Sequence, residues 1–271
     1  MDQRVTIEIT DGVADVRLVR ADKMNALDNA MFAGLIEAGE TLKVNDKVRA
    51  VVLSGEGRAF CAGLDASNFG RMAEGGGASG GGEDATDRLG ARTHGIANRA
   101  QYAVWVWREL QVPVIAAVHG VAFGGGFQLM LGADMRYIAP DARLSILEIK
   151  WGLVPDMAGT QLMRHLVRED IVRELTYTGR IFSGTEAGQI GFATRVCDDP
   201  RAEALKVARE IAGKSPDAIR AAKRIFNTAP YRSVADGFMD ESIEQGRLIG
   251  SANQVEAVMA NLQKREPNFA D

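Results

Sequence analysis

Two carboxylates, Glu148 and Asp156, lie eight residues apart in a largely apolar stretch between Leu144 and Thr160. A carboxylate among apolar neighbours either finds a partner or has a raised pKa. Two carboxylates in different environments can act as acid and base in one reaction. Composition alone favours a simpler interpretation, in which both are surface or salt-bridged acids. The pair therefore indicates proton-transfer chemistry only if the rest of the chain supports it.

Three consecutive glycines, Gly124 to Gly126, stand between an apolar segment and a pattern typical of a helix start. The apolar segment, residues 114–118, is short and follows Pro113, which predicts a buried strand. This order would place bare backbone N–H groups at the positive end of a helix, where they can stabilise an anion. The same glycines equally fit a tight turn with close helix–strand packing, because such turns are a weak signal.

Residues 54–65 form a second segment of small residues after a predicted strand. Its backbone could also be open to a ligand. A surface turn is the simpler interpretation of this segment.

Strands predominate in the first part of the chain. Residues 5–10 and 13–19 alternate apolar and polar side chains around Asp11-Gly12, which predicts a β-hairpin. Short apolar runs predict further strands over residues 48–53, 114–118, 135–139 and 192–196. Because the order of strands and helices is not a simple alternation, we predict an α/β fold of repeated strand–strand–helix units.

Helices are predicted between these strands and after them. Asp28 is a candidate N-cap for a helix that ends near residue 43, and another helix is expected over residues 92–110 with Ile96 on its buried stripe. Helical periodicity then continues over residues 201–213, 216–228, 231–249 and 252–264. We therefore divide the chain into a core, residues 1–196, and a helical C-terminal region, residues 197–271. Such terminal helices often pack on another subunit, so an oligomer is expected.

The composition is that of an ordinary globular protein. With 46% hydrophobic residues, a net charge of −4 and no 18-residue apolar run, neither nucleic-acid binding nor a membrane span is indicated. Cys61, Cys197 and the three histidines form no metal-ligand or disulfide pattern. The terminal segments carry no signal-peptide or peroxisomal pattern, which predicts a cytoplasmic protein. The glycine-rich run at residues 75–82 is predicted to be a flexible loop.

Several of these segments together resemble those of one family, in the order and at the distances that the family shows. The matching segments are Lys23-Met24-Asn25-Ala26-Leu27, Gly57-Arg58-Ala59-Phe60-Cys61-Ala62-Gly63-Leu64-Asp65, His119-Gly120-Val121-Ala122-Phe123-Gly124-Gly125-Gly126, Gly152-Leu153-Val154-Pro155, Gly159-Thr160-Gln161 and Gln263-Lys264-Arg265-Glu266-Pro267-Asn268-Phe269. Over nearly its full length, the chain resembles the enoyl-CoA hydratase/isomerase (crotonase) superfamily. The resemblance implies a spiral of repeated ββα units, with C-terminal helices that mediate a homotrimer, often paired as a homohexamer.

The resemblance also implies an acyl-CoA thioester substrate and an oxyanion hole. By position, the backbone N–H groups of Leu64 and Gly125 would form that hole. Two fixed donors, one at a helix N-terminus, suit the enolate oxygen that develops when the carbon beside a thioester loses or gains a proton.

Four further residues match or adjoin family positions that contact CoA. Lys23 and Ala62 match contacts to the nucleotide end, and Asp65 lies near them. Lys264 matches a lysine that can reach CoA bound to a neighbouring subunit, and cations near phosphates make physical sense. CoA is part of the substrate, and no metal or redox cofactor is implied.

The resemblance implies alternative reactions at the acid–base positions. Enoyl-CoA hydratases carry two glutamates, and this chain has Gln128 at the first position and Glu148 at the second. Glutamine cannot exchange protons near neutral pH. Dienoyl-CoA isomerases carry a Glu and an Asp at the spacing of Glu148 and Asp156, with a further Asp where Gln128 stands here.

We therefore expect double-bond isomerisation by proton transfer between Glu148 and Asp156. Hydration remains an alternative, with Glu148 as the main acid–base group and Gln128 or Asp156 positioning water. Thioester hydrolysis, decarboxylation and dehalogenation also occur in the superfamily. An alternative of another class is an acyl-CoA-binding protein without turnover.

Overall fold

A β-hairpin opens the chain, as its alternating pattern predicts. The computed structural model describes residues 3–65 and 89–271, and the glycine-rich run at residues 75–82 lies outside this part. Strands β1 (Val5–Thr10) and β2 (Val13–Leu18) pair antiparallel, with Val5 opposite Leu18. Asp11 and Gly12 between them both have positive φ, the backbone of a tight hairpin turn.

The hairpin forms one side of a six-stranded sheet with the order β1-β2-β3-β4-β6-β9. All pairs in this sheet except β1–β2 are parallel. The other strands of the sheet are β3 (Ala50–Gly55), β4 (Val114–Val118), β6 (Met135–Ile138) and β9 (Arg195–Val196). A smaller sheet contains β5 (Val121–Phe123), β7 (Arg143–Ser145) and β8 (Phe182–Ser183).

Both faces of the larger sheet are covered. Val51 and Leu53 of β3 belong to the main hydrophobic cluster, which also holds residues of helices α1 (Asn29–Lys43), α4 (Arg99–Glu109) and α5 (Gly125–Leu131). Ala50 and Val52 point to the other face and pack with helix α9 (Pro200–Ala212). Burial on both faces explains why these strands read as continuous apolar runs.

Two helix starts show how local capping sets element boundaries. The Asp28 side chain accepts a hydrogen bond from the Met31 N–H at 2.7 Å and caps α1, as expected. The helix expected over residues 92–110 begins only at α4. There the side chains of Asn98 and Gln101 each accept a hydrogen bond from the other's N–H at 2.9 Å. The expected burial of Ile96 is therefore wrong, because it lies before this cap and is 77% exposed.

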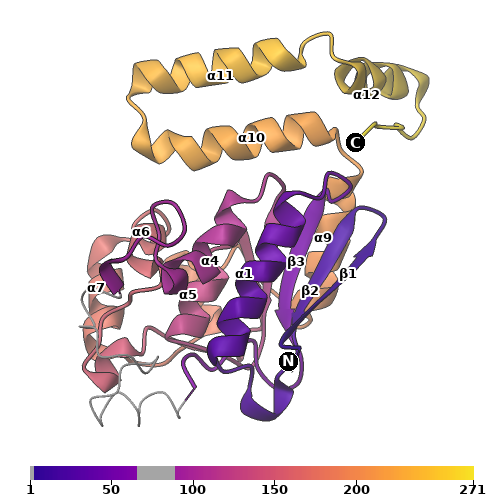
Figure 1. Cartoon of the computed structure of the whole chain (residues 1–271). Helices are drawn as coiled ribbons and strands as arrows, with labels where there is room; N and C mark the ends of the chain where they lie inside the picture. The colour runs from indigo at the N-terminus through magenta and orange to yellow at the C-terminus, as the bar shows by residue number, and fades with distance from the viewer. Residues whose placement is uncertain (1–2, 66–88) are drawn as a thin grey trace.

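The remaining helices form short connections and a separate C-terminal layer. The short helices are η1 (Ala21–Lys23), η2 (Glu148–Trp151), α6 (Gly159–Met163), α7 (Glu169–Thr178), α8 (Gly184–Ile190) and η3 (Ala229–Tyr231). The long C-terminal helices are α10 (Pro216–Thr228), α11 (Val234–Leu248) and α12 (Ala252–Gln263). Figure 1 shows α10, α11 and α12 beyond the end of the sheet, whereas α9 lies against the sheet itself.

A buried lysine ties this C-terminal layer to the core. The Nζ of Lys223, in α10, lies 2.8 Å from Oδ2 of Asp134 and donates to the Val112 carbonyl at 2.8 Å. The same Asp134 oxygen accepts the Val114 N–H at 2.7 Å, at the first residue of β4. Burial lowers the pKa of Lys223, and the neighbouring Asp134 opposes that shift. The first of the protruding helices is thus anchored where β4 begins.

Candidate active site

Residues 61–65 form the centre of the candidate site. Their backbone is hydrogen-bonded to β5 on one side and to Leu27 on the other. The N–H and carbonyl of Cys61 bond to the first and last residues of β5, at 3.0 and 3.1 Å. On the other side, the Leu27 N–H donates to the Gly63 carbonyl at 2.8 Å, and the Asp65 N–H donates to the Leu27 carbonyl at 3.1 Å. The segment is therefore not a free surface turn.

This pairing leaves the Leu64 N–H unpaired on the side away from Leu27, since successive N–H groups of an extended chain point in opposite directions. Gly125 is the first residue of α5, so its N–H has no partner within the helix. In the described parts of the chain, neither N–H donates a hydrogen bond. The two segments touch, because a Cβ on Gly63 would lie 3.6 Å from the Gly125 nitrogen. The two donors therefore lie on segments that are in contact, which is one requirement of an oxyanion hole.

The glycines of this turn also permit very close packing. A Cβ on Gly126 would lie 2.2 Å from the Cys61 carbonyl oxygen, far inside van der Waals contact. Gly124 has a φ of +50°, and a Cβ there would lie 3.4 Å from Oε1 of Glu148. Both interpretations of the three glycines therefore apply: they allow close helix–strand packing, and they leave backbone N–H groups exposed at the helix start.

Glu148 places its carboxylate beside this turn. The residue begins η2 and is 9% exposed. Its Oε1 accepts a hydrogen bond from Nε2 of Gln128 at 2.6 Å, whereas Oε2 is buried with no hydrogen-bond partner among the described residues. Burial raises the pKa of Glu148 and the charge of Asp156 raises it further, whereas hydrogen bonds from the Glu148 backbone and from Gln128 lower it. A carboxyl with a raised pKa is a candidate for proton transfer.

Gln128 is bonded in three directions inside the protein. It lies on α5 and is 1% exposed. Its Oε1 accepts the N–H groups of Met157 and Gly159 at 2.8 and 2.9 Å, while its Nε2 donates to Glu148. Nothing in the sequence indicated that the Met157 and Gly159 N–H groups bond to Gln128, because this contact depends on how the loop at residues 157–159 folds back onto α5.

Asp156 is held next to this bonded loop. It directly precedes Met157, and its side chain is accessible to solvent in the single chain. Surrounding protein atoms still desolvate the carboxyl and raise the pKa of Asp156. The structure thus brings together five residues that the sequence analysis singled out as candidates: Leu64, Gly125, Gln128, Glu148 and Asp156.

Comparison with known proteins identifies the family. The family model described as enoyl-CoA hydratase/isomerase matches residues 8–271. This chain belongs to that family. Its members include the crotonase-type enzymes, so the resemblance seen in the sequence motifs is confirmed at the level of the superfamily, and the mixed α/β fold with a helical C-terminal region agrees with its structural neighbours.

Relatives in the family differ in the activity that they are named for. The chain is 31% identical to the peroxisomal Delta(3,5)-Delta(2,4)-dienoyl-CoA isomerase of Arabidopsis thaliana, over 100% of this chain and 99% of the relative. It is 28% identical to the mitochondrial methylglutaconyl-CoA hydratase of Mus musculus, over 95% of this chain and 79% of the relative. The structure of an enoyl-CoA hydratase from Bacillus anthracis superposes with a TM-score of 0.87 at 27% identity, covering 98% of this chain and 99% of that one.

The residues matched to CoA contacts of the family fall into two places. Lys23 is exposed on η1, and the Ala62 N–H donates to the Met24 carbonyl at 2.9 Å, so these two lie close together. Asp65 lies next to them, but its Oδ2 accepts from Nη1 of Arg20 at 2.6 Å. The two residues are 45 positions apart, and no local pattern in the sequence pairs Arg20 with Asp65.

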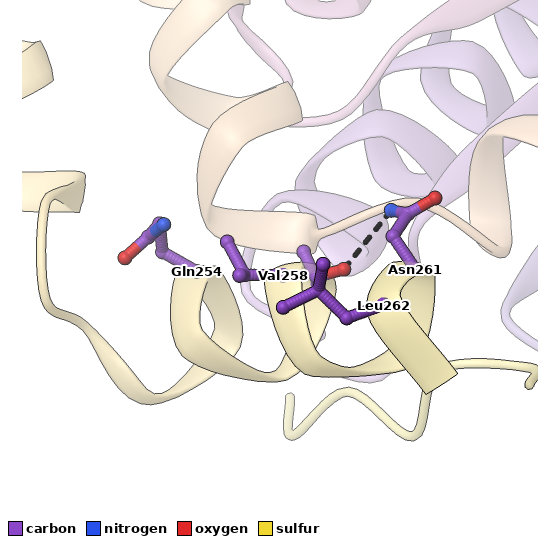
Figure 2. Close-up of a pocket in the computed structure, with 5 residues that line it drawn as sticks. Gln254, Val258, Asn261 and Leu262 are labelled. Atoms are coloured by element: carbon purple, nitrogen blue, oxygen red, sulfur yellow. Dashed lines mark hydrogen bonds between the residues drawn. The ribbon is translucent and has the colours of Figure 1, made fainter. Parts of the chain in front are cut away.

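Lys264 lies apart from the other candidate residues within one subunit. It follows α12, which Figure 1 places at the other end of the molecule from α5 and α6. A shallow cavity of ≈ 330 Å³ is found on α12 and is lined by Gln254, Ala257, Val258, Asn261 and Leu262 (Figure 2). The Asn261 side chain bonds to the Ala257 carbonyl of its own helix, and the cavity contains no acid or base. It is therefore separate from the acid–base residues.

Neither a metal cluster nor a spanning helix is found in the described parts of the chain. Within residues 3–65 and 89–271, no three His, Cys, Asp or Glu side chains are grouped so that they could hold a metal ion. Over the same residues, no helix has the length and apolar character needed to cross a membrane.

The raised pKa of Glu148 predicts a pH-dependent stability difference. The folded state binds more protons than the unfolded state between the two pKa values of this residue, so the free energy of unfolding falls as pH rises through that window. Glu148→Gln removes this dependence. We expect the wild type to lose stability relative to E148Q as pH rises from about 4, near the pKa of an unfolded glutamate, toward 7.

The measurement is denaturant unfolding of both proteins over a pH series. Glu37→Gln, a change at an exposed glutamate on α1, serves as the control and should show no such trend. A flat difference between wild type and E148Q, or one of opposite sign, would contradict the assignment of a buried carboxyl with a raised pKa.

Proposed function

We propose that this enzyme moves a double bond within an unsaturated acyl-CoA, with Glu148 and Asp156 as the proton-transferring pair. The observation that carries this proposal is the complete engagement of the Gln128 oxygen. A carbonyl oxygen has two lone pairs, and the Met157 and Gly159 N–H groups occupy both. Gln128 therefore cannot accept a hydrogen bond from water and orient it as a second glutamate would. Asp156 is then the second acid–base group of the site.

The proposed reaction neither consumes nor releases water. One carboxylate removes a proton from a carbon of the acyl chain, and the electron pair of that C–H bond moves through the conjugated system to the thioester oxygen. The N–H groups of Leu64 and Gly125 stabilise the resulting oxyanion. The other carboxyl then donates its proton to a different carbon, which restores the thioester and leaves the double bond displaced. Raised pKa values of both Glu148 and Asp156 keep protonated and ionised forms accessible.

Hydration is the second candidate, and two observations favour it. Asp156 is accessible to solvent and could hold a water opposite Glu148. The relatives also include proteins named as methylglutaconyl-CoA hydratases. In this reaction Glu148 would be the main acid–base group and the product would contain one more water.

Mass analysis of the product in heavy-oxygen water separates the candidates. We expect a 3,5-dienoyl-CoA to give a product of unchanged mass with a displaced double bond. A labelled product that has gained one water from a 2-enoyl-CoA would instead establish hydration. Tight binding of acyl-CoAs without conversion, across chain lengths and unsaturation patterns, would indicate a binding protein without turnover.

Substitution of the two carboxyls tests the proposed pair directly. Glu148→Gln and Asp156→Asn should each lower kcat by at least about 10²-fold, because each removes a general acid or base. Steady-state kinetics on the substrate that the mass analysis identifies would measure the loss. Wild-type turnover by both variants would eliminate this assignment.

The C-terminal helices support a second proposal, self-association into a homotrimer that can pair as a homohexamer. A single chain exposes large apolar side chains on these helices, among them Phe226 (75%), Val234 (74%), Phe238 (64%) and Leu262 (74%). Exposed apolar surface of this extent is typical of an interaction site. In such an assembly Lys264 could reach CoA on a neighbouring subunit, and Lys23, Ala62 and Asp65 would lie beside the nucleotide end. A cytoplasmic location stays a prediction.

Sedimentation equilibrium tests the assembly. We expect a mass of three or six chains for the wild type and a smaller mass for Phe238→Asp, because the charge would be buried at the interface. Val44→Asp is the control, since Val44 is 79% exposed but lies outside the C-terminal helices. A single monomer mass, independent of concentration, would contradict the proposal.

A further inference from the structure

Gln128 is almost fully buried and bonds both to Glu148 and to the peptide that follows Asp156. We propose that it is a positioning residue that fixes Glu148 through Oε1, so that Oε2 alone exchanges protons with the acyl chain. The proposal rests on the proposed acid–base role of Glu148. It goes beyond that role because it assigns the reacting atom and the group that selects it.

The orientation of the Gln128 amide is determined by its surroundings. Its oxygen faces two backbone N–H donors, those of Met157 and Gly159, and an amide nitrogen could not take that place without opposing donor to donor. The nitrogen must therefore face Glu148, and it donates to Oε1 at 2.6 Å. The Met157 and Gly159 N–H groups thus fix the orientation of the Gln128 amide, and the amide in turn orients the Glu148 carboxylate.

Two glycines hold this arrangement tightly. A Cβ on Gly159 would lie 2.6 Å from Oε1 of Gln128, and a Cβ on Gly124 would lie 3.4 Å from Oε1 of Glu148. Backbone therefore packs against the carboxylate and lies closer to Oε1 than to Oε2, which would be 3.9 Å from the Cβ on Gly124. The other oxygen, Oε2, is left buried and unpaired among the described residues, which is the state expected for an atom that completes its bonding with substrate.

The Gln128 amide also bonds to the chain next to the second carboxylate, Asp156. Because the Met157 N–H is bonded to Gln128, the peptide that follows Asp156 is attached to α5. Gln128 therefore relates the positions of Glu148 and Asp156 to each other and to Gly125, the first residue of the same helix. A loss of this hydrogen bond would misplace the pair, and a misplacement of about 1 Å can cost 10²-fold in rate.

Gln128→Met tests the inference, because methionine has a similar length but no hydrogen-bonding amide. We expect kcat to fall by about 10- to 10²-fold while KM changes little, since the Gln128 side chain is only 1% exposed and offers almost no surface for a substrate to contact. The limb of the pH profile that reports Glu148 should move to higher pH, because the lost hydrogen bond favoured the ionised carboxylate. Gln189→Met, at an exposed glutamine on α8, is the control.

Gln128→Glu is the second variant. A glutamate has the same shape as glutamine and can still accept the Met157 and Gly159 N–H groups. It places a second carboxyl opposite Oε1 of Glu148, so that the two groups must share a proton. The same pH limb should move to higher pH even if the methionine variant is poorly folded. An unchanged limb in Q128E, or a raised KM with unchanged kcat in Q128M, would overturn the inference.

A double-mutant cycle with Glu148→Gln separates this inference from the proposed function. If Gln128 acts through Glu148, Q128M should lower kcat less in the E148Q background than in the wild type, because only the part that it contributes through Asp156 is left to lose. Additive losses would overturn the positioning role while leaving Glu148 as a catalytic residue. Wild-type turnover by E148Q would instead reject the proposed function itself.

Discussion

The contact between the start of α5 and residues 61–65 is the constraint on which the rest of the site depends. Gly126 can approach the Cys61 carbonyl only because it has no side chain, since a Cβ would lie 2.2 Å from that oxygen. This approach brings the segments that carry the Leu64 and Gly125 N–H groups into contact. The β5 strand on one side and Leu27 on the other hold residues 61–65 in register, so the two donors are fixed before any ligand binds.

Glu148 lies beside the glycine turn at the start of α5, and burying its carboxylate there costs free energy of folding. A buried carboxyl with one unpaired oxygen is unfavourable when ionised, and burial accordingly raises its pKa. The hydrogen bond from Gln128 limits that cost, and the second oxygen has no partner among the described residues. Stability is thereby reduced at the position where the proposed reaction transfers a proton, as is common at functional sites.

The larger sheet supplies the rigidity that such spacing requires. Its parallel strands are buried on both faces, by α1, α4 and α5 on one side and α9 on the other. The loops that carry the site follow or precede strands of the two sheets, so small changes in strand packing would move the donors. Lys223 extends this frame to α10 through its ion pair with Asp134, which in turn caps the start of β4.

The sequence by itself determined the features that depend on local pattern and on motif order. Alternation around Asp11-Gly12 predicted the hairpin, and the position of Asp28 predicted the start of α1. The ordered motifs predicted the superfamily, which the family match confirms. They also singled out Leu64, Gly125, Glu148 and Asp156 as candidate site residues. Such patterns record which neighbours along the chain share a face or a cap, and they need no knowledge of the path of the chain.

The tertiary structure alone decided which groups bond to one another across the chain. Gln128 was placed at an acid–base position by its motif, yet its three partners lie 20 to 31 residues away, and two of them occupy both acceptor positions of its oxygen. Arg20 meets Asp65 across 45 residues. Hydrogen bonds of this kind form only when the fold brings distant loops next to each other. The local periodicity of a sequence does not show which loops become neighbours. The sequence therefore indicated which residues could react, and the fold decided which of them is free to do so.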